Sequence, residues 1–325
     1  MPHFKKWCLV TLSLAPSFIF GWHWGYWVAL ELAILSSSFY IPQRQLKWGI
    51  LAILLQELII MMGFFILYHS LGHPLIFTVV CTVWAGLSMG IIIHGKHLRG
   101  FASWILIPSL YFAIDFKDSP FVHSISHNWA VIAQLLAIAA AGPILVCIYE
   151  YVMDKNNEFV LWGFNGALHP QFDFEEVGTI AALMLAVLMA SIIVWQFNLP
   201  HAEWIIWSTA SVSTGQIQSM RKKIFHRGSG AIIGLVLGLT LVVGLKGYSP
   251  FLFQVAALLI PFTLFLDVYP LAFASRCTLI VLAAGSVAHG EFEAGYRILN
   301  VILGGMAGGI SGYLIYSLSR TLHYK

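Results

Sequence analysis

Two glutamates lie inside long apolar segments of the sequence, where an ionisable group is costly and therefore a functional candidate. Glu31 lies in segment 24–41 and Glu57 in segment 49–69, each about 10–13 Å along a helix from its start. Because these helices would run in opposite directions, we expect the two carboxyl groups at a similar depth. Two interpretations stay open: proton carriers, or neutral acids hydrogen-bonded to a neighbouring helix.

Hydroxyl side chains are concentrated in one later apolar segment, 202–218, and include Ser208, Thr209 and Ser211. They can donate hydrogen bonds to a carboxylate, or hold their helix to itself or to a neighbour. Arg297 begins the last apolar segment, on a side where basic residues are scarce. It is a candidate for attracting an anion, and the alternative is pairing with an acidic side chain or backbone carbonyls.

Glycines recur four residues apart in two segments, at Gly230, Gly234 and Gly238 and again at Gly304 and Gly308. Small residues at this spacing let two helix backbones approach closely within a membrane. We therefore predict a structural, helix-packing role for these glycines. Arg227 precedes the first set, and we expect it to be a structural anchor that reaches the lipid headgroups.

The composition determines the class of protein that must position these residues. Of 325 residues, 10% are charged and 59% are hydrophobic, whereas a soluble domain has about 25% charged residues. This excludes a soluble enzyme, a secreted domain and a nucleic-acid-binding protein. The apolar runs predict an all-α polytopic membrane bundle of about twelve transmembrane helices, at residues 6–21, 24–41, 49–69, 74–95, 99–116, 128–152, 178–198, 202–218, 228–246, 250–268, 271–289 and 294–318.

The basic residues predict the orientation of this bundle. With the N-terminus in the cytoplasm and every helix crossing, fourteen of the 17 Lys and Arg residues fall on the inner side and three on the outer side. Such a bias is typical of membrane proteins. We expect a multi-pass protein with both termini cytoplasmic.

Recurring landmarks indicate that the chain is duplicated. The longest polar break, 153–177, separates a first six-helix membrane repeat at 1–152 from a second at 178–325, and is expected to be a short cytoplasmic connector. Trp27 and Trp204 begin the second helix of each half, and a basic cluster follows each of these helices. Six crossings return the chain to its starting side, so the repeats would be parallel.

Three motifs resemble those of a known family. The segment 199–210, aromatic and then threonine-containing, and the pattern Arg-x-x-Gly-x-x-x-Gly at 227–234 resemble the fusaric acid resistance and aromatic acid exporter family. The pattern Arg-x-x-Asn-x-x-x-Gly at 297–304 is similar to that family's C-terminal signature. The resemblance is best over 178–318. It differs in lacking the large cytoplasmic domain typical of the family and in having Ala231 where threonine is usual.

The resemblance implies a transporter that exports small organic, often aromatic, acid anions across the bacterial inner membrane, with or without proton coupling. It adds Trp204 and Asn300 to Arg297, Ser208, Thr209 and Ser211 as candidate substrate-binding residues. Beside the substrate, the expected partners are membrane lipid and either further copies of the chain or a periplasmic adaptor protein.

Alternative functions stay open, namely an uncoupled organic anion channel or a membrane scaffold without a substrate. We expect no enzyme, because no paired acids and no nucleophile with a base appear in the sequence. No cofactor and no metal site are expected either, since the histidine pairs have no carboxylate beside them.

Overall fold

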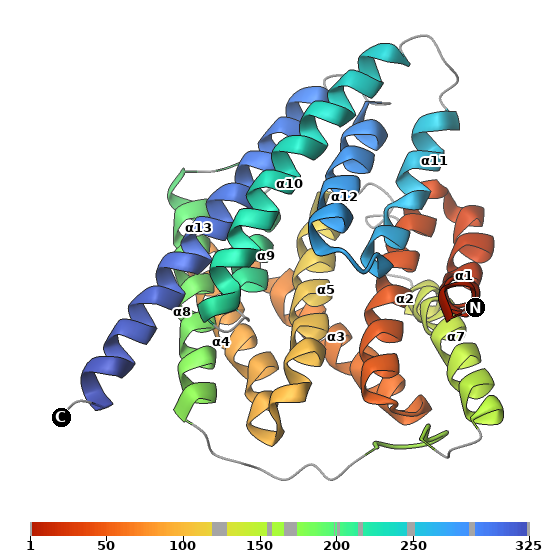
Figure 1. Cartoon of the computed structure of the whole chain (residues 1–325), viewed down its shortest axis with the longest axis horizontal. Coiled ribbons are helices and arrows are strands. Elements are labelled where there is room, and N and C mark those ends of the chain that lie inside the picture. The colour runs from red at the N-terminus through yellow and green to blue at the C-terminus, as the bar shows by residue number, and fades with distance from the viewer. Residues whose placement is uncertain are drawn as a thin grey trace.

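The structure is a computed structural model that describes residues 2–118, 129–154, 158–165, 174–197, 199, 202–213, 217–245, 251–285 and 290–323. Within these ranges the chain forms α-helices and short 3₁₀ helices and no strands (Figure 1). The first half contains six α-helices, α1 (Pro2–Gly21), α2 (Tyr26–Leu46), α3 (Ile50–Ser70), α4 (Pro74–Gly90), α5 (Arg99–Asp118) and α7 (Trp129–Met153).

The second half also contains six described α-helices, α8 (Phe174–Phe197), α9 (Ala202–Ser213), α10 (Ile217–Gly244), α11 (Phe251–Leu259), α12 (Tyr269–Ala284) and α13 (Gly290–His323). Four 3₁₀ helices complete the described structure: η1 (Trp22–Trp24), η2 (Ile91–His94), η3 (Lys96–Leu98) and η4 (Pro261–Phe265).

Six of the described helices are long and apolar enough to cross a membrane. They comprise Ile50–Ser70, Pro74–His94, Ala130–Met153, Glu175–Phe197, Met220–Gly244 and Gly295–Ser317, and shorter apolar helices lie between them. The prediction of an all-α, multi-pass membrane protein is therefore confirmed.

Two predicted helices differ from the observed ones for identifiable reasons. The helix expected at 228–246 already begins at Ile217, because the basic run 221–227 continues the helix instead of forming a loop. The helix expected at 250–268 ends at Leu259, and η4 follows it. Pro261 is at the start of η4, where proline lacks the N–H that an α-helix interior requires.

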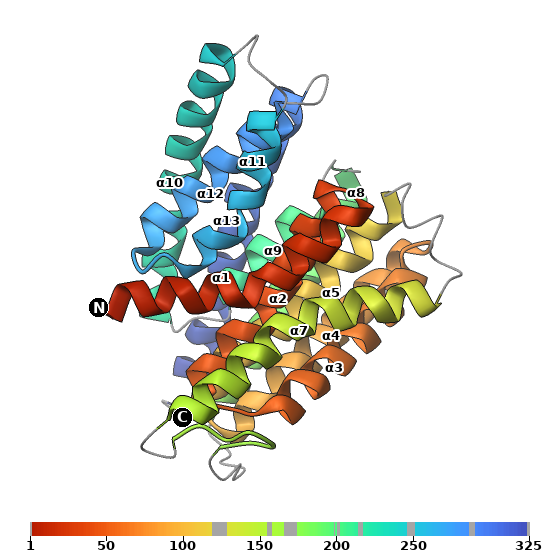
Figure 2. The ribbon, with the colours of Figure 1, turned by 90° about the vertical axis from the view of Figure 1, so that its right-hand side faces the viewer.

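The helices of each half pack in a similar set of pairs. In the first half α1 contacts α2 and α7, α2 contacts α7, and α3 contacts α5 and α7. In the second half α8 contacts α9 and α13, α9 contacts α13, and α10 contacts α12 and α13. Figure 2 shows α10, α11 and α12 grouped apart from α3, α4 and α7.

The halves meet mainly where α4 packs on α8 and α5 packs on α9. A second junction joins α1 to the segment around η4, with Phe18 stacked on Phe262 at 5.9 Å and Lys6 donating to Asp267 at 2.5 Å. Between these junctions α2 packs on α11 and η4, so the described halves are in contact from α4 and α8 across to α1 and η4.

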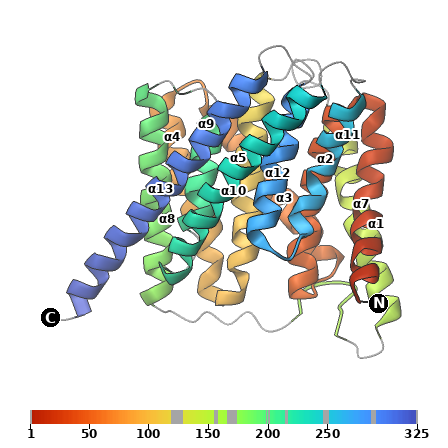
Figure 3. The same ribbon diagram turned by 45° about the horizontal axis from the view of Figure 1, so that its top comes forward.

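The described part of the connector, 158–165, lies against one end of the bundle. The amide of Ile50 donates to the carbonyl of Leu161 at 3.0 Å, and the indole N–H of Trp48 donates to the carbonyl of Asn165 at 3.2 Å. Figure 3 places the start of α1 and the end of α13 at the same end as this connector. We call this the terminal end of the bundle and the other the far end.

Candidate functional site

A cation lies on an aromatic ring near the far end of the second half. Arg297 is in the second turn of α13, and its guanidinium carbon is 5.4 Å from the ring centroid of Trp204 on α9. The Nε atom of Arg297 is buried and has no hydrogen-bond partner. The charge of Arg297 is thus held by the face of an indole ring and keeps one donor for a further acceptor.

The ring of Trp204 begins an aromatic row that crosses from one half to the other. Trp204 is stacked on Trp207 with a centroid separation of 5.0 Å, and Trp207 meets Tyr111 of α5 edge to face at 5.5 Å. Sequence reasoning missed Trp207 and Tyr111. Trp207 is one helical turn from Trp204, which is a usable signal, but nothing in the sequence connects Tyr111 with α9.

The hydroxyl groups predicted near this site are used inside the protein. Ser208 donates to the carbonyl of Val301 at 2.6 Å, and Thr209 donates to the carbonyl of Gly304 at 2.9 Å. Both side chains are fully buried. The sequence left open whether these hydroxyls bind a carboxylate or hold helices together. In the structure they hold α9 to α13 and so position Trp204 beside Arg297.

The glycines lie where helix backbones approach each other. A methyl group on Gly304 would overlap the carbonyl oxygen of Ile205, and one on Gly308 would lie 2.7 Å from that of Thr209. On α10, a methyl group on Gly234 would lie 2.6 Å from the carbonyl oxygen of Ala274 on α12. Gly230 and Gly238 face α12 in the same way. A larger residue at position 304, 308 or 234 therefore requires a helix backbone to move, whereas one at 230 or 238 first meets the side chain of Phe273 or Val281.

Arg227 is predicted to reach the lipid headgroups, and the structure places it among side chains of neighbouring helices. The residue is 8% exposed, and its Nη1 donates to the hydroxyl of Ser211 at 2.7 Å. Its guanidinium carbon is 4.8 Å from the ring centroid of Phe273. The reason is that α10 begins earlier than predicted, which places Arg227 inside the helix instead of at its end. Ser211 is therefore an acceptor for Arg227.

Asn300 is one turn after Arg297 on α13 and is 2% exposed. Residues 297, 300, 304 and 308 are spaced by three or four positions and so share one face of α13. This face carries the contacts to α9 described above. The C-terminal signature therefore forms one side of the α9–α13 contact.

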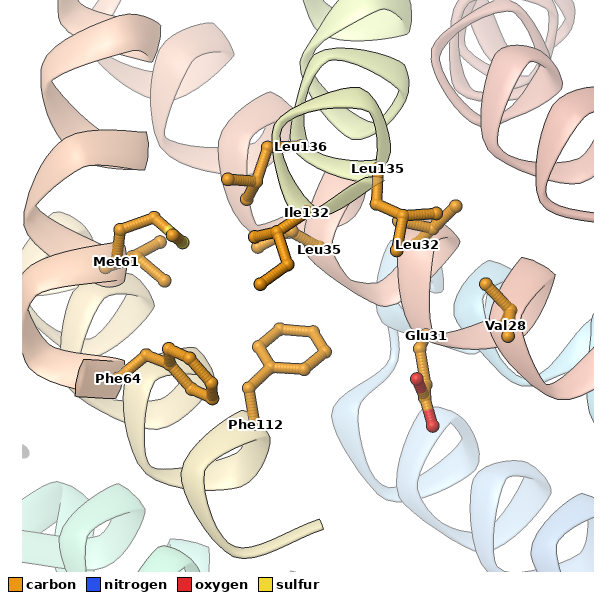
Figure 4. A pocket seen from close by; sticks show the side chains of 11 residues that line it. Val28, Glu31, Leu32, Leu35, Met61, Phe64, Phe112, Ile132, Leu135 and Leu136 are labelled. Carbon is orange, nitrogen blue, oxygen red and sulfur yellow. The ribbon is translucent and has the colours of Figure 1, made fainter. Parts of the chain in front are cut away.

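Glu31 lies at the edge of an apolar cavity in the first half. Figure 4 shows Met61, Phe64, Phe112 and Ile132 around a common space, with Glu31 to one side next to Val28. The lining residues come from α2, α3, α5 and α7 and include Leu32, Leu35, Ile60, Leu135 and Leu136. This cavity suits an apolar group and offers one carboxyl group at its rim.

Glu57 is not at the depth of Glu31, so the expectation of a shared depth is wrong. The amide of Gln56 donates to the carbonyl of Ser38 at 2.8 Å, and this contact fixes how α3 lies along α2. Glu31 lies seven residues before Ser38 on α2, and Glu57 lies one residue after Gln56 on α3. Because the two helices run in opposite directions, both steps lead toward the same end of the bundle. The two glutamates therefore differ in level by six residues of helix, or about 9 Å.

Within the described residues, no group of three or more His, Cys, Asp or Glu side chains is placed to hold a metal ion. The site therefore consists of a guanidinium, an aromatic row and a helix contact that orients them. Such an arrangement can attract an anion and pack against a flat ring.

Comparison with known proteins agrees with the resemblance seen in the motifs. The searches of curated proteins and of solved structures gave no match. The match to a family model covers α8 to α12 and the first part of α13, and so includes Trp204, Arg227 and Arg297. Residues 177–310 of this multi-pass membrane protein match the fusaric acid resistance protein-like family, which indicates a membrane transporter of the efflux type.

Proposed function

We propose that this protein exports small organic acid anions, aromatic ones in particular, and that Arg297 and Trp204 contact the substrate. The observation that carries the proposal is the guanidinium of Arg297 on the ring of Trp204, at the end of an aromatic row that reaches the other half. Arg297 would attract the carboxylate, while the indole rings would pack against the aromatic ring. Asn300, Ser208 and Thr209 would hold α9 and α13 in position, and Ser211 would hold Arg227 of α10.

The charge of Arg297 is strong enough to matter for binding. Two unit charges 4 Å apart attract by about 4 kcal/mol at an effective dielectric constant of 20. The unpartnered Nε of Arg297 supplies a donor that a carboxylate can accept. The ring of Trp204 also keeps the guanidinium from turning to solvent.

The proposed transport route lies between two repeats in the bacterial inner membrane. The similar helix pairs in the two halves support a duplication into six-helix repeats at 1–152 and 178–325. The bias of basic residues supports a cytoplasmic terminal end. Arg297, near the far end, would then lie toward the outer side, where the anion leaves.

Export of substrate anions tests the assignment directly. Cells with Arg297→Gln protein at normal abundance should export benzoate several-fold more slowly than wild type, and Arg297→Lys should keep part of the activity because it keeps the charge but loses the planar fork. Trp204→Ala should also slow export. Trp195→Ala is the matched control, because Trp195 is 41% exposed on α8. Wild-type export by Arg297→Gln would contradict the assignment.

Proton coupling is the second part of the proposal, with Glu57 and Glu31 as carriers. Glu57→Gln should remove the pH dependence of export while leaving exchange down a gradient. An uncoupled channel would instead pass sustained current in a sweep of membrane potential. A scaffold protein would do neither, and no acid would leave the cells faster with the protein than without it.

A further inference from the structure

Four basic side chains on three helices form a series in which each charge is within electrostatic reach of the next. Arg99 begins α5, Lys223 and Arg227 lie on α10, and Arg276 lies on α12. Lys223 is within electrostatic reach of both Arg227 and Arg99, and Arg276 is within reach of Arg227. We call these four residues the basic cluster. It combines one residue from the first half with three from the second.

No described carboxylate is paired with the basic cluster. The ion pairs in the described ranges join other cations to acids, namely Lys6 to Asp267, Arg44 to Glu150 and Lys47 to Glu158. Cations brought together and partly removed from water repel each other unless an anion joins them. Among the residues that the structure describes, positive charge therefore exceeds negative charge at the cluster.

Several nitrogen donors of the basic cluster have no hydrogen-bond acceptor. Nε and Nη2 of Arg99 are both buried without a hydrogen-bond partner, and so is Nε of Arg227. Nε and Nη2 lie on one edge of a guanidinium, the edge that binds both oxygens of a carboxylate. Buried donors of this kind are satisfied in nearly all proteins, so their state points to a ligand with oxygen acceptors.

Neighbouring groups hold two of the arginines in place. Arg227 donates to Ser211 at 2.7 Å and stacks on Phe273, and Nε of Arg276 donates to the hydroxyl of Thr263 at 3.0 Å. These are neutral partners, so they orient the guanidinium groups without neutralising them. The cluster is thus organised before any ligand arrives.

We propose that the basic cluster is an anion-binding site for dissolved organic dicarboxylates, with Arg99 gripping one carboxylate and Arg227 contacting the other. This proposal rests on the proposed export function in one respect: the site would receive the anion before it moves along the transport route to Arg297. Arg99 and Tyr111 are both on α5, twelve residues apart, or about 18 Å. The cluster and the aromatic row thus lie along the same helix.

Binding to purified protein tests the site apart from transport. We would titrate phthalate, a dicarboxylate, and benzoate, a monocarboxylate, into protein in phosphatidylcholine nanodiscs and measure affinity by calorimetry. Phthalate should bind more tightly than benzoate. Arg99→Gln should weaken phthalate binding about tenfold or more, since hydrogen bonds to charged groups are strong, and Arg99→Lys should recover part of the loss.

Arg221→Gln is the matched control, because Arg221 is an exposed arginine on the same α10 helix and its loss lowers the net charge equally. Its affinity for phthalate should equal that of wild type. Equal weakening by Arg221→Gln, or wild-type affinity in Arg99→Gln, would overturn the site. Thermal midpoints recorded for each variant, and the charge-retaining Arg99→Lys, separate loss of binding from loss of folding.

The phosphate group of a lipid offers the same oxygen acceptors as a carboxylate. We would therefore repeat the phthalate titration in nanodiscs of phosphatidylglycerol. Unchanged phthalate affinity in them supports a dissolved ligand. Loss of phthalate binding there, together with a phosphatidylglycerol molecule that native mass spectrometry finds on wild type and not on Arg99→Gln, would assign the cluster to lipid and overturn the proposal. Phthalate binding that depends on Arg99 in a protein that exports no acid would refute the export function alone.

Discussion

In the second half of the molecule, glycines let helix backbones touch along two helices, whereas in the first half one such contact, Gly142 of α7 on Ser13 of α1, accompanies contacts that large aromatic side chains fill. Gly304 and Gly308 bring α13 against α9, and Gly234 brings α10 against α12. In the first half, Trp84 of α4 lies on Gly63 of α3, and Trp48 packs between Phe101 and Phe164 at 5.1 and 4.9 Å. Similar helix pairs are thus held by different means.

The difference bears on where a site can form. Close backbone contact leaves no room between α9 and α13, so Arg297 and Trp204 are held at fixed positions on their surface. Packing by large side chains leaves gaps where rings do not fit together, and the cavity beside Glu31 is one of them (Figure 4). We therefore expect the glycine contacts of α10 and α13 to be sensitive to added volume and the aromatic contacts of the first half to be sensitive to lost volume.

The largest expected effect comes from removing volume in the first half. Trp48→Ala should lower the free energy of unfolding by about 3–5 kcal/mol, because Trp48 is 2% exposed and also holds the connector through Asn165. Trp27→Ala is the control, since Trp27 is 42% exposed. Chemical unfolding in detergent measures both. Equal losses for the two would show that Trp48 is not a packing centre.

Adding one methyl group in the second half should have the next largest effect. Gly304→Ala should cost about 1–3 kcal/mol of stability, because the methyl would overlap the Ile205 carbonyl oxygen. Gly305→Ala is the neighbouring control, where the nearest atom to a new methyl is 3.9 Å away. It should be neutral or stabilising by up to about 1 kcal/mol. A stable Gly304→Ala protein would contradict the close contact.

Buried hydrogen bonds between helices should have smaller effects. Gln56→Leu removes donors to the carbonyls of Ser38 and Trp104, at 2.8 and 3.2 Å. Thr209→Val removes one donor to Gly304. A side-chain hydrogen bond between membrane helices contributes about 0.6 kcal/mol on average, so Gln56→Leu should cost more than Thr209→Val. Thr240→Val is the control, since Thr240 is exposed and bonds only within α10.

The sequence predicted the class of fold because apolar runs of helix length follow one another along the chain. It misplaced the start of α10, since helix continuation through the basic run 221–227 depends on contacts with other helices. The glycine spacing was informative because it repeats with the period of the helix. The pairing of Tyr111 with Trp207 and the neighbours of Arg99 could not be predicted, because they join helices from different halves.

The same limit explains the hydroxyls of α9. Their clustering in the sequence was clear, but the sequence does not state which way they face. The acceptors of Ser208 and Thr209 are backbone carbonyls of α13, and every residue has such a carbonyl. The sequence therefore shows which side chains can donate a hydrogen bond, but it does not show which carbonyl accepts it.

The smallest expected effect concerns the exposed contact that joins the two halves. The ammonium of Lys6 donates a hydrogen bond to the carboxylate of Asp267 and lowers the pKa of that carboxyl group. A lowered pKa in the folded state means that the contact contributes stability above the ordinary Asp pKa of about 3.9 and loses it as pH falls through the folded value. Because Asp267 is fully exposed, solvent and salt weaken the interaction. Asp267→Asn should therefore slightly lower the thermal midpoint at pH 7 in low salt and leave it unchanged in acid strong enough to protonate Asp267 in the folded protein. Lys6→Gln should behave in the same way, and the double variant should add nothing to either single change.

A difference between wild type and Asp267→Asn that persisted in acid would show that the residue acts through the turn before α12, and the junction at α1 would then depend on Phe18 and Phe262 alone.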